Sequence, residues 1–556
     1  MKKNYTSLLM LACGMLFSQE TKVLWQKDIR SSTQDFLTTM TSTIDRQILL
    51  SGSSINQKSQ QLSTDNQQQN RGYDYHIVKL DQQGSKVWEK YFGGTRHDYL
   101  MSSITTQEGG FALVGTSFSN ISGDKKENNL GGSDLWLIRL SENGEELWQK
   151  TLGTKNNDEA SAVVQSTDLG FFVAGNINDN KKLFGSKDVF VSKLDKDGIL
   201  KQTTILGGKG LDEATDMIPT PDGGVVLLVY STSGKAVNIN NTDRTHSQNN
   251  TPNTSSENIN PEMTSTVKTF IGKSEDSYGN GDYWIIKLDK NSNVEWQKAF
   301  GGSGDDRPKI IANTKDGYIV LGESTSQSSG NKKENIKEGT DLWVLNLDRS
   351  GNEIWQKNYN FGNRDVAMSL DVIRKTNKDN FSEDRGFLLG GYTQSEEKVK
   401  KDDEKFWMLY IDTNGKEEWR KYVEGKEKKN EERLVSAKLQ SDGSYFLAGT
   451  SAEELGKENW KVVKLLDSDV ENLIENKDIR IYPNPVKDYC YVEIGLDFEQ
   501  ADIYVYDMTG KVTQQSQTKN KVTKVDTSRL PQGVYIIKAN IPTQKDKKLT
   551  AKIMKE

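Results

Sequence analysis

Apolar residues occur along this chain in short runs that are separated by polar turns rich in glycine and aspartate. Residues 111–114, 135–138 and 284–286 are apolar at every position, so neither face of the corresponding strand is polar. A strand with one face in water alternates apolar and polar positions, whereas a strand covered on both faces does not. Outside residues 1–19 no segment has a sustained helical period. The pattern predicts an all-β protein whose central strands are covered on both faces.

The tryptophans follow a repeat in which a first aromatic position precedes a second one by twelve residues. Four units have tryptophan at both positions: Trp136 and Trp148, Trp284 and Trp296, Trp343 and Trp355, Trp407 and Trp419. Two further units keep the spacing with substitutions, because His76 precedes Trp88 and Phe190 precedes Gln202. Units recur about every 60 residues, and a period of this kind is typical of repeat architectures.

Two tryptophans show how the repeat ends. Trp460, in the last unit, has Asn472 at the second position, whereas Trp25 carries the sequence around a second tryptophan with no first partner. One unit is therefore divided between the two ends of the array. The sequence predicts a closed ring of seven units in which the N-terminal strand completes the last unit.

Each unit contains signals for four short strands. In the second unit we expect strands at 100–106, 111–117, 135–140 and 146–152, separated by glycine-containing turns. Four antiparallel strands per unit, repeated around a ring, are typical of a β-propeller. The predicted fold of residues 20–468 is a seven-bladed β-propeller closed by its N-terminal strand.

The repeated residues have structural explanations. A buried tryptophan hides roughly 150–250 Å² of surface, so we interpret the tryptophans as wedges between blades. Short acidic side chains cap turns by accepting backbone N–H groups. This interpretation covers the repeated aspartates Asp74, Asp134, Asp188, Asp282, Asp341, Asp98, Asp158, Asp212, Asp306 and Asp365, and the turn residues Asp81, Asp195, Asp348 and Asp412. A ring of calcium sites is the alternative, but calcium needs about six or more oxygen ligands. We expect no metal and no cofactor.

The two ends and one insert have distinct compositions. Residues 1–19 are typical of a secretory signal peptide, and Cys13 leaves a lipoprotein signal as the alternative. After signal removal Cys490 is the only cysteine, so no internal disulfide is expected. Residues 232–279 have the Asn, Ser and Thr content of a disordered loop. Residues 469–478 are interpreted as a linker.

Residues 479–556 lack tryptophan and contain three motifs in order, 481–485 (IYPNP), 505–511 (VYDMTGK) and 530–536 (LPQGVYI). The segment resembles the type A C-terminal sorting domain of the type IX secretion system of Bacteroidetes. The resemblance implies an immunoglobulin-like β-sandwich, recognition by the type IX machinery, and a location outside the cell or on its outer surface, reached through the periplasm. The residues that carry it are Tyr482, Pro483, Asn484, Pro485, Gly510, Leu530, Gly533 and Tyr535. The repeat itself resembles Trp- and Gly-rich repeats of exported proteins of that phylum.

Charge and composition exclude several functions. The net charge is −6, but residues 20–478 carry 58 basic against 70 acidic residues, and no basic stripe with interleaved aromatics suits nucleic acid. Outside the signal sequence no segment is long and apolar enough for a transmembrane helix. The three histidines and the cysteines lack catalytic or zinc-binding spacing.

A functional residue in a repeat protein should break the repeat. Candidates at one connection after the Gly-Gly motif are Arg96-His97, Arg307-Pro308 and Arg364, with ordinary loop variation as the alternative explanation. We identify no catalytic residue. The sequence favours a secreted or surface-attached binding or structural module. It does not name the ligand, and a glycan and a protein both stay open. The alternative is a glycan- or polysaccharide-acting enzyme with a site at one end of the ring.

Overall fold

The structure is a computed structural model. It describes residues 21–29, 35–55, 72–178, 184–236, 239–240, 267–376, 382–394, 405–423, 431–440, 442–452, 458–474, 478–496, 498–544, 546–547 and 549–556. The predicted signal peptide lies outside the described residues, as do residues 241–266 of the predicted insert.

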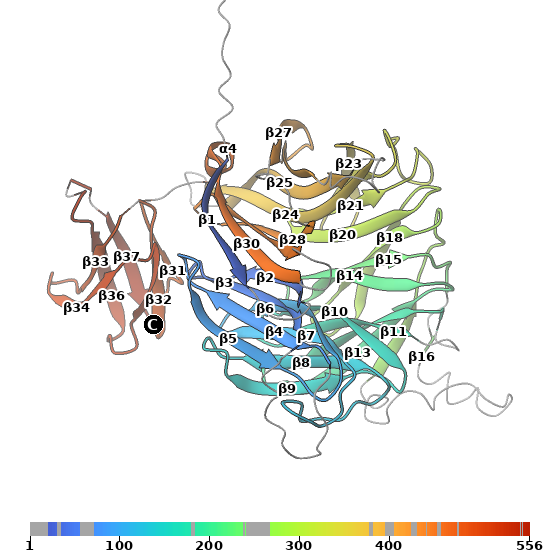
Figure 1. The fold of residues 1–556 in the computed structure, drawn as a ribbon, viewed down its shortest axis with the longest axis horizontal. Helices are drawn as coiled ribbons and strands as arrows, with labels where there is room; N and C mark the ends of the chain where they lie inside the picture. Colours follow the sequence, from blue (N-terminus) through green and yellow to red (C-terminus); the bar gives the residue numbers. More distant parts are fainter. Residues whose placement is uncertain are drawn as a thin grey trace, which may run out of the picture.

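The repeat region folds into successive antiparallel sheets, each built from one unit (Figure 1). The first sheet comprises β2 (Asp35–Ser42), β3 (Ile48–Ser54), β4 (Asp74–Leu80) and β5 (Lys86–Phe92). The second comprises β6 (Asp98–Thr105), β7 (Phe111–Ser117), β8 (Asp134–Leu140) and β9 (Glu146–Leu152). The third comprises β10 (Asn157–Gln165), β11 (Phe171–Asn178), β12 (Asp188–Leu194) and β13 (Leu200–Gly207), and two short strands from the insert extend it beyond β13. In the second sheet, β7 and β9 have the bounds that the turn signals predict.

The remaining sheets repeat this order. The fourth comprises β14 (Asp212–Pro219), β15 (Val225–Ser231), β18 (Asp282–Leu288) and β19 (Val294–Phe300). The fifth comprises β20 (Asp306–Asn313), β21 (Gly317–Ser324), β22 (Asp341–Asp348) and β23 (Glu353–Tyr359). The sixth comprises β24 (Arg364–Thr376), β25 (Ser382–Gln394), β26 (Lys405–Asp412) and β27 (Glu417–Val423). The last comprises β28 (Glu431–Leu439), β29 (Ser444–Ala452), β30 (Glu458–Leu466) and β1 (Lys22–Ile29).

The last sheet joins the two ends of the repeat region. β1 pairs antiparallel with β30, so that Ile29 faces Trp460 and Trp25 faces Lys464 (Figure 1). The first strands of the sheets, from β2 to β28, contact one another in chain order, and β28 also contacts β2. We call the boundary between the first and last sheets the seam. A strand from the start of the chain therefore completes the sheet at its end.

Tryptophans at the first repeat position are core residues. Trp136, Trp284, Trp343, Trp407 and Trp460 are fully buried. Each lies on the third strand of its sheet. β8 and β18 are buried at every position because both faces are covered, whereas in β30 half-buried and buried positions alternate from Asn459 to Val463. His76 takes the first position in the first sheet, where its ring stacks on Tyr91 and its Nε2 lies 2.9 Å from Glu89 Oε1.

Tryptophans at the second position are partly buried and reach the next sheet. Trp148 lies against Gly198, where an added Cβ would approach the indole to 2.8 Å. Its Nε1 donates a hydrogen bond of 3.2 Å to Lys196 O in the same turn. Trp88, Trp296 and Trp355 make the equivalent bonds to Glu142 O, Arg349 O and Thr413 O. Gly198 has φ +81°, so glycine satisfies both the turn conformation and the close contact with the indole.

The prediction that residues 232–279 form a disordered loop is wrong at the C-terminal side of this insert. β17 (Val267–Gly272) pairs parallel with β13 and antiparallel with β16 (Ile239–Asn240). Nearby, Lys273 is fully buried and its Nζ donates to Ser231 Oγ at 2.8 Å and to Ser233 O at 3.0 Å. The composition of the insert does not reveal this strand, because its pairing depends on the edge of a sheet that is distant in sequence.

The predicted linker also needs correction at its start. α4 (Ser468–Glu471) follows β30, and Asp467 caps it by accepting Asp469 N at 2.9 Å and Val470 N at 3.3 Å. Val470 and Leu473 are buried in a core cluster with Tyr445. A four-residue helix is too short to produce a helical period in the sequence. The repeat region therefore extends to Leu473.

The C-terminal segment forms two sheets around one core. One sheet has the order β31 (Ile479–Tyr482), β32 (Tyr489–Ile494) and β35 (Val522–Asp526). The other has the order β34 (Val512–Thr518), β33 (Ala501–Tyr506), β36 (Gly533–Asn540) and β37 (Leu549–Lys555). Val492, Ile503, Ile537 and Ile553 meet between them. Cys490 is buried in the same core as a free thiol.

Candidate functional site

The first strands β2, β6, β10, β14, β20 and β24 all begin at one end of the repeat region, which we call the leading end. At this end, parallel bridges join the start of the third strand of one sheet to the start of the first strand of the following sheet, as between Ser133 and Asn157. The repeated aspartates lie here and accept backbone N–H groups four residues earlier. Examples are Asp98 with Gly94 N, Asp212 with Gly208 N, Asp306 with Gly302 N and Asp282 with Tyr278 N, at 2.6–2.8 Å.

These carboxyl groups act as turn caps, and some also contact each other. Burial raises the pKa of Asp158 to about 8, with a further contribution from the charge of Asp134, to which Asp158 is hydrogen-bonded. Burial likewise raises the pKa of Asp134 to about 6. Within the described residues no three His, Cys, Asp or Glu side chains converge as metal ligands. The carboxylates therefore act as turn caps through the backbone N–H groups that they accept.

A second set of polar residues at the leading end joins neighbouring sheets. Each lies on the second strand of its sheet. It accepts the N–H of the third or fourth residue in the first strand of the following sheet. The pairs are Ser53 with Leu100 N at 2.9 Å, Thr116 with Ala160 N at 2.9 Å, Asn176 with Ala214 N at 2.9 Å, and Glu323 with Ala367 N. This bond repeats around the sheets, so a polar residue at this position is structural when it obeys the pattern.

Tyr230 breaks this pattern. It occupies the same position on β15, but the residue that would donate to it on β20 is Pro308, which has no N–H. Tyr230 Oη donates instead to Asp305 Oδ1 at 2.7 Å, and Asp305 Oδ2 accepts Arg307 Nε at 2.7 Å. The Arg307 guanidinium lies over the Tyr230 ring at 4.6 Å from its centroid. The sequence candidate Arg307-Pro308 therefore belongs to a cluster in which each member replaces part of the repeat.

An acidic pair adjoins this cluster. Lys187 Nζ bridges Glu159 Oε2 at 2.9 Å and Glu213 Oε1 at 2.6 Å, which joins the third sheet to the fourth. Although burial alone would lower the pKa of Lys187, these two carboxylates raise it. The hydrogen bond from Lys187 overcomes burial and lowers the pKa of Glu159. Lys187 and Glu159 therefore form a charged pair near neutral pH.

The other side of the leading end is aromatic. The rings of Phe36 and Tyr73 lie 5.2 Å apart, those of Tyr73 and His97 5.6 Å apart, and His97 stacks on Tyr99 at 5.5 Å with an interplanar angle of 7°. Phe36 is 45% exposed, and His97 is exposed. Phe118 packs edge-on against Tyr99. We call Phe36, Tyr73, His97 and Tyr99 the aromatic cluster.

The structure places the remaining sequence candidates at the same end. Arg96 precedes the aromatic cluster and donates its backbone N–H to Ser119 Oγ at 3.0 Å. Arg364 begins β24, and its side chain is exposed. Glu323 also lies at this end, and the sequence pattern did not identify it as a candidate functional residue. Burial raises its pKa, while Lys309, the backbone of Ala367 and Arg364 oppose this shift.

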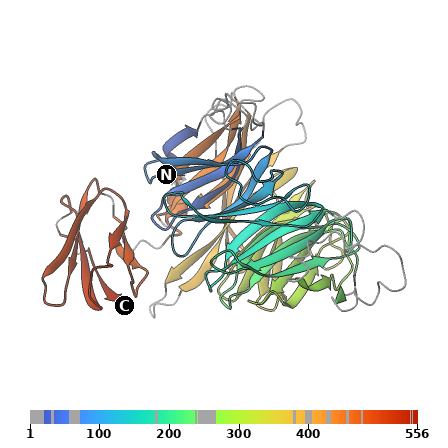
Figure 2. The same cartoon turned by 90° about the horizontal axis from the view of Figure 1, so that it is seen from below.

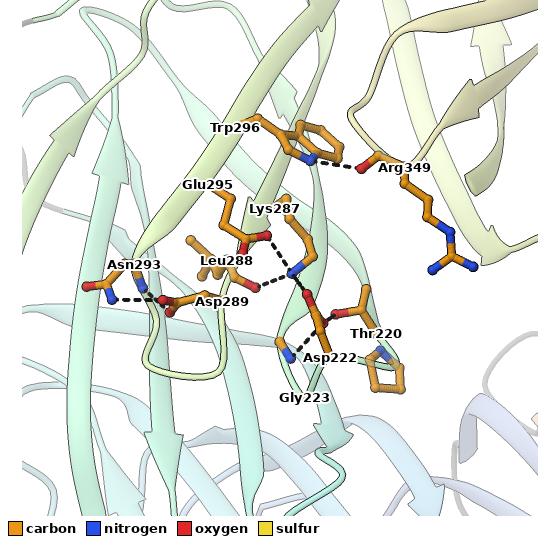
Figure 3. Close-up of polar contacts among 12 residues, drawn as sticks. Thr220, Asp222, Gly223, Lys287, Leu288, Asp289, Asn293, Glu295, Trp296 and Arg349 are labelled. Carbon is orange, nitrogen blue, oxygen red and sulfur yellow. Dashed lines mark hydrogen bonds and ion pairs between the residues drawn. The ribbon is translucent and has the colours of Figure 1, made fainter. Parts of the chain in front are cut away.

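The opposite end carries a repeated buried cation. Lys287 Nζ contacts Asp222 Oδ2 at 2.8 Å, Glu295 Oε2 at 3.0 Å and Leu288 O at 2.9 Å (Figure 3). Lys193 makes the equivalent pair with Asp168 at 2.8 Å, and Arg139 the equivalent pair with Glu108 at 3.8 Å. Because this arrangement recurs from sheet to sheet, we interpret it as the cap of the hairpin between the first two strands.

The sorting-motif residues lie in and beside the C-terminal sheets. Tyr482 ends β31, Gly510 occupies a turn at φ +85°, and Gly533 begins β36. Asn484 Oδ1 accepts Met554 N at 2.9 Å, and Tyr535 Oη donates to Pro531 O at 2.8 Å. The first motif therefore contacts the final strand β37. The three motifs form one folded unit.

Comparison with known proteins identifies this unit. Residues 480–556 match the secretion system C-terminal sorting domain family. No curated protein matches the sequence. Solved structures with a similar arrangement include a protein of unknown function from Dyadobacter fermentans at 9% identity and TM-score 0.37, covering 81% of this chain and 100% of that chain.

Two further solved structures are the polysaccharide lyase Uly1 and the type IX secretion component PorZ of Porphyromonas gingivalis. Uly1 is 9% identical with TM-score 0.40, over 80% of this chain and 99% of that one. PorZ is 9% identical with TM-score 0.19, over 94% of this chain and 82% of that one. These TM-scores are low, and we rest no inference on them. In the described residues no helix is long and apolar enough to cross a membrane. The chain carries a type IX sorting domain at its C-terminus, which indicates a secreted or cell-surface protein.

Proposed function

We propose that residues 20–474 form a seven-bladed β-propeller closed by the N-terminal strand, and that this propeller is a binding or structural module that the type IX system exports. The export part rests on one observation, the family match of residues 480–556. The propeller part is supported by the contacts of the first strands in chain order, by the contact of β28 with β2, and by the pairing of β1 with β30. The signal peptide at 1–19 would take the chain to the periplasm first.

We place the ligand-binding surface at the leading end. Phe36 and His97 of the aromatic cluster are exposed, and the cluster of Tyr230, Asp305 and Arg307 departs from a bond that its equivalents keep. Aromatic faces beside charged hydrogen-bonding groups suit a ligand with both apolar faces and hydroxyl or charged groups. A glycan has this chemistry, and so does a polar protein surface.

The second candidate, a glycan-acting enzyme, is favoured by the convergence of Glu159, Glu213, Tyr230 and Asp305 at one end. General acid–base catalysis works best with a group whose pKa lies near the working pH. Lys187 keeps the pKa of Glu159 low, and burial together with the bond to Asp305 raises the pKa of Tyr230 to about 12. These shifts move both groups away from neutrality, so binding without turnover is the function that we place first.

A glycan array paired with activity screens on the same sugars tests this proposal. We expect binding without turnover, and His97→Ala and Tyr230→Phe should each weaken it by about tenfold or more. The matched control is Ile354→Ala, an exposed apolar residue near the start of the outermost strand β23, at the end opposite the leading end. Turnover that is abolished by one substitution would favour the enzyme, and binding that survives both leading-end changes would remove the proposed surface.

Export is tested in a host with a type IX system. A chain that ends at Ile474 keeps α4 and its buried Val470, so it should fold, cross the inner membrane and accumulate in the periplasm. Residues 476–556 placed behind a signal-bearing reporter should carry it out of the cell. Loss of β37, which pairs with β36 and contacts Val486, should block this. Normal amounts of the shortened chain in the medium would contradict the assignment.

A further inference from the structure

The sorting domain contacts the repeat region through one face. β31 and β32 lie on the side of the sorting domain that is next to the first sheet (Figure 1), and Figures 1 and 2 show the C-terminal sheets to one side of the repeat sheets. The groups of the repeat region that contact the sorting domain lie in turns at the end opposite the leading end. These turns belong to the first, second and last sheets of the repeat region.

Arg46 is the centre of this contact. It lies in the turn between β2 and β3 at φ +59°, and its side chain is 6% exposed. Its Nη2 lies 2.6 Å from Glu493 Oε1 on β32, and Glu493 is also 6% exposed. Its Nη1 lies 3.3 Å from Asp442 Oδ2, in the turn between β28 and β29. One guanidinium therefore binds a carboxylate of the last sheet and a carboxylate of the sorting domain.

Tyr482 of the first sorting motif adjoins this ion pair. Its Oη lies 3.0 Å from Glu493 Oε2 and 3.2 Å from Ile44 O in the same turn as Arg46. Burial, together with the charge of Glu493, raises the pKa of Tyr482 well above its ordinary value. A residue that identifies the sorting domain in sequence thus contacts the repeat region and is half-buried.

Two further contacts flank the centre. Gln82, in the turn between β4 and β5, donates to Val522 O at 3.0 Å and accepts Lys521 N at 3.0 Å, which extends the edge of the sorting-domain sheet. Lys524 Nζ lies 2.7 Å from Glu142 Oε1 in the second sheet and 3.9 Å from the Tyr489 ring centroid. Backbone and side-chain groups on both sides are therefore matched over three sheets.

We propose that this face of the sorting domain is a docking surface for the seam of the same chain, and that the domain stays bound there after the linker is cut. A charged pair that is nearly excluded from water is stable only when both partners are present. Arg46 meets Asp442 only when the first and last sheets are packed together, so the docking site is complete only on a closed seam. This inference does not depend on the ligand of the leading end.

Docking has a direct consequence for export. Docking places the Tyr482 hydroxyl 3.2 Å from Ile44 O and leaves the side chain half-buried, so a protein that binds this hydroxyl competes with docking on the seam. Removal of Asp442 should weaken docking although Asp442 belongs to the last sheet, because Arg46 then loses one of its two carboxylates.

The test uses the full chain with a protease recognition sequence inserted between Ile474 and Asp478. After complete cleavage we expect the sorting domain to co-elute with the repeat region in size-exclusion chromatography at micromolar concentration. Glu493→Gln should weaken the association by about two orders of magnitude, since breaking one partner of a buried pair is strongly unfavourable. The matched control is Glu499→Gln, an exposed carboxylate in the loop after β32, which should leave it unchanged.

A second series tests the seam. Gln82→Ala and Asp442→Asn should each weaken the association by about tenfold, and circular dichroism of the uncut chains should show that each variant is folded. Separation of the two parts of the parent protein after cleavage would overturn the proposal. An equal affinity of the parent and Glu493→Gln would also overturn it, and an unchanged affinity of Asp442→Asn would remove the dependence on the seam.

Discussion

Trp25 connects the N-terminal strand to two neighbouring elements, so its removal tests the closure of the repeat region. Its ring packs at 5.4 Å from the Phe446 ring in the last sheet, and a Cβ added to Gly84 in the first sheet would approach it to 3.0 Å. It is partly buried, whereas Trp136, a tryptophan at the first repeat position, is fully buried. Complete burial of an aromatic side chain corresponds to about 4–6 kcal/mol at ~25 cal/mol per Å², as an upper bound.

Because Trp25 keeps part of its surface in water, we expect Trp25→Ala to lower the free energy of unfolding by about 2–3 kcal/mol. Trp136→Ala removes a large aromatic from the core and should cost more, ~3–5 kcal/mol. In the described residues Trp25 Nε1 has no hydrogen-bond partner, so Trp25→Phe keeps most of the packing and should cost about 1 kcal/mol or less. Urea denaturation followed by far-UV circular dichroism measures all three variants. A Trp25→Ala protein as stable as the parent would refute the idea that this strand holds the seam.

Three other outcomes follow from the structure. Burial raises the pKa of Asp158 from 3.8 to about 8, so the stability that its protonated form contributes is full below about pH 4 and is lost as the pH rises to about 8. Asp158→Asn should flatten this decline in thermal melts between about pH 5 and pH 9. An unchanged pH profile would contradict the raised pKa. Burial alone would raise the pKa of Asp222, but the bond from Lys287 lowers it to about 2, so the stability that this pair contributes is lost as the pH falls from about 4 to about 2. Lys287→Met should lower stability at neutral pH and remove this part of the acid-induced loss, so that melts between about pH 4 and pH 2 show a flatter decline. An equally steep decline in the variant would exclude the pair as a source of stability. Deletion of residues 241–266 leaves β17 in place and should change the melting temperature by no more than about 2 °C, whereas a larger fall would show that the deleted residues stabilise the fold.

The strands and their turns follow from the sequence because their causes are local. The runs at 111–114 and 135–138 predicted strands covered on both faces, and both runs lie within buried strands, β7 and β8. Aspartate and glycine at fixed offsets predicted the hairpins. In the turn from Asp195 to Ile199, Asp195 Oδ1 accepts Asp197 N and Ile199 N, and Gly198 has φ +81°. The divided repeat unit identified the strand around Trp25 as the partner of the last unit, and β1 pairs with β30.

Contacts between distant residues needed the tertiary structure. The sequence marked Arg307-Pro308 as a departure from the repeat, but the reason, a missing N–H opposite Tyr230, appears only when β15 and β20 are side by side. β17 and α4 were missed because each is short and is stabilised by a partner far away in the chain. Arg46 looks like an ordinary turn residue in the sequence. Its role depends on two carboxylates about 400 or more positions later, because burial and ion pairing are properties of packing that no local pattern of residues encodes.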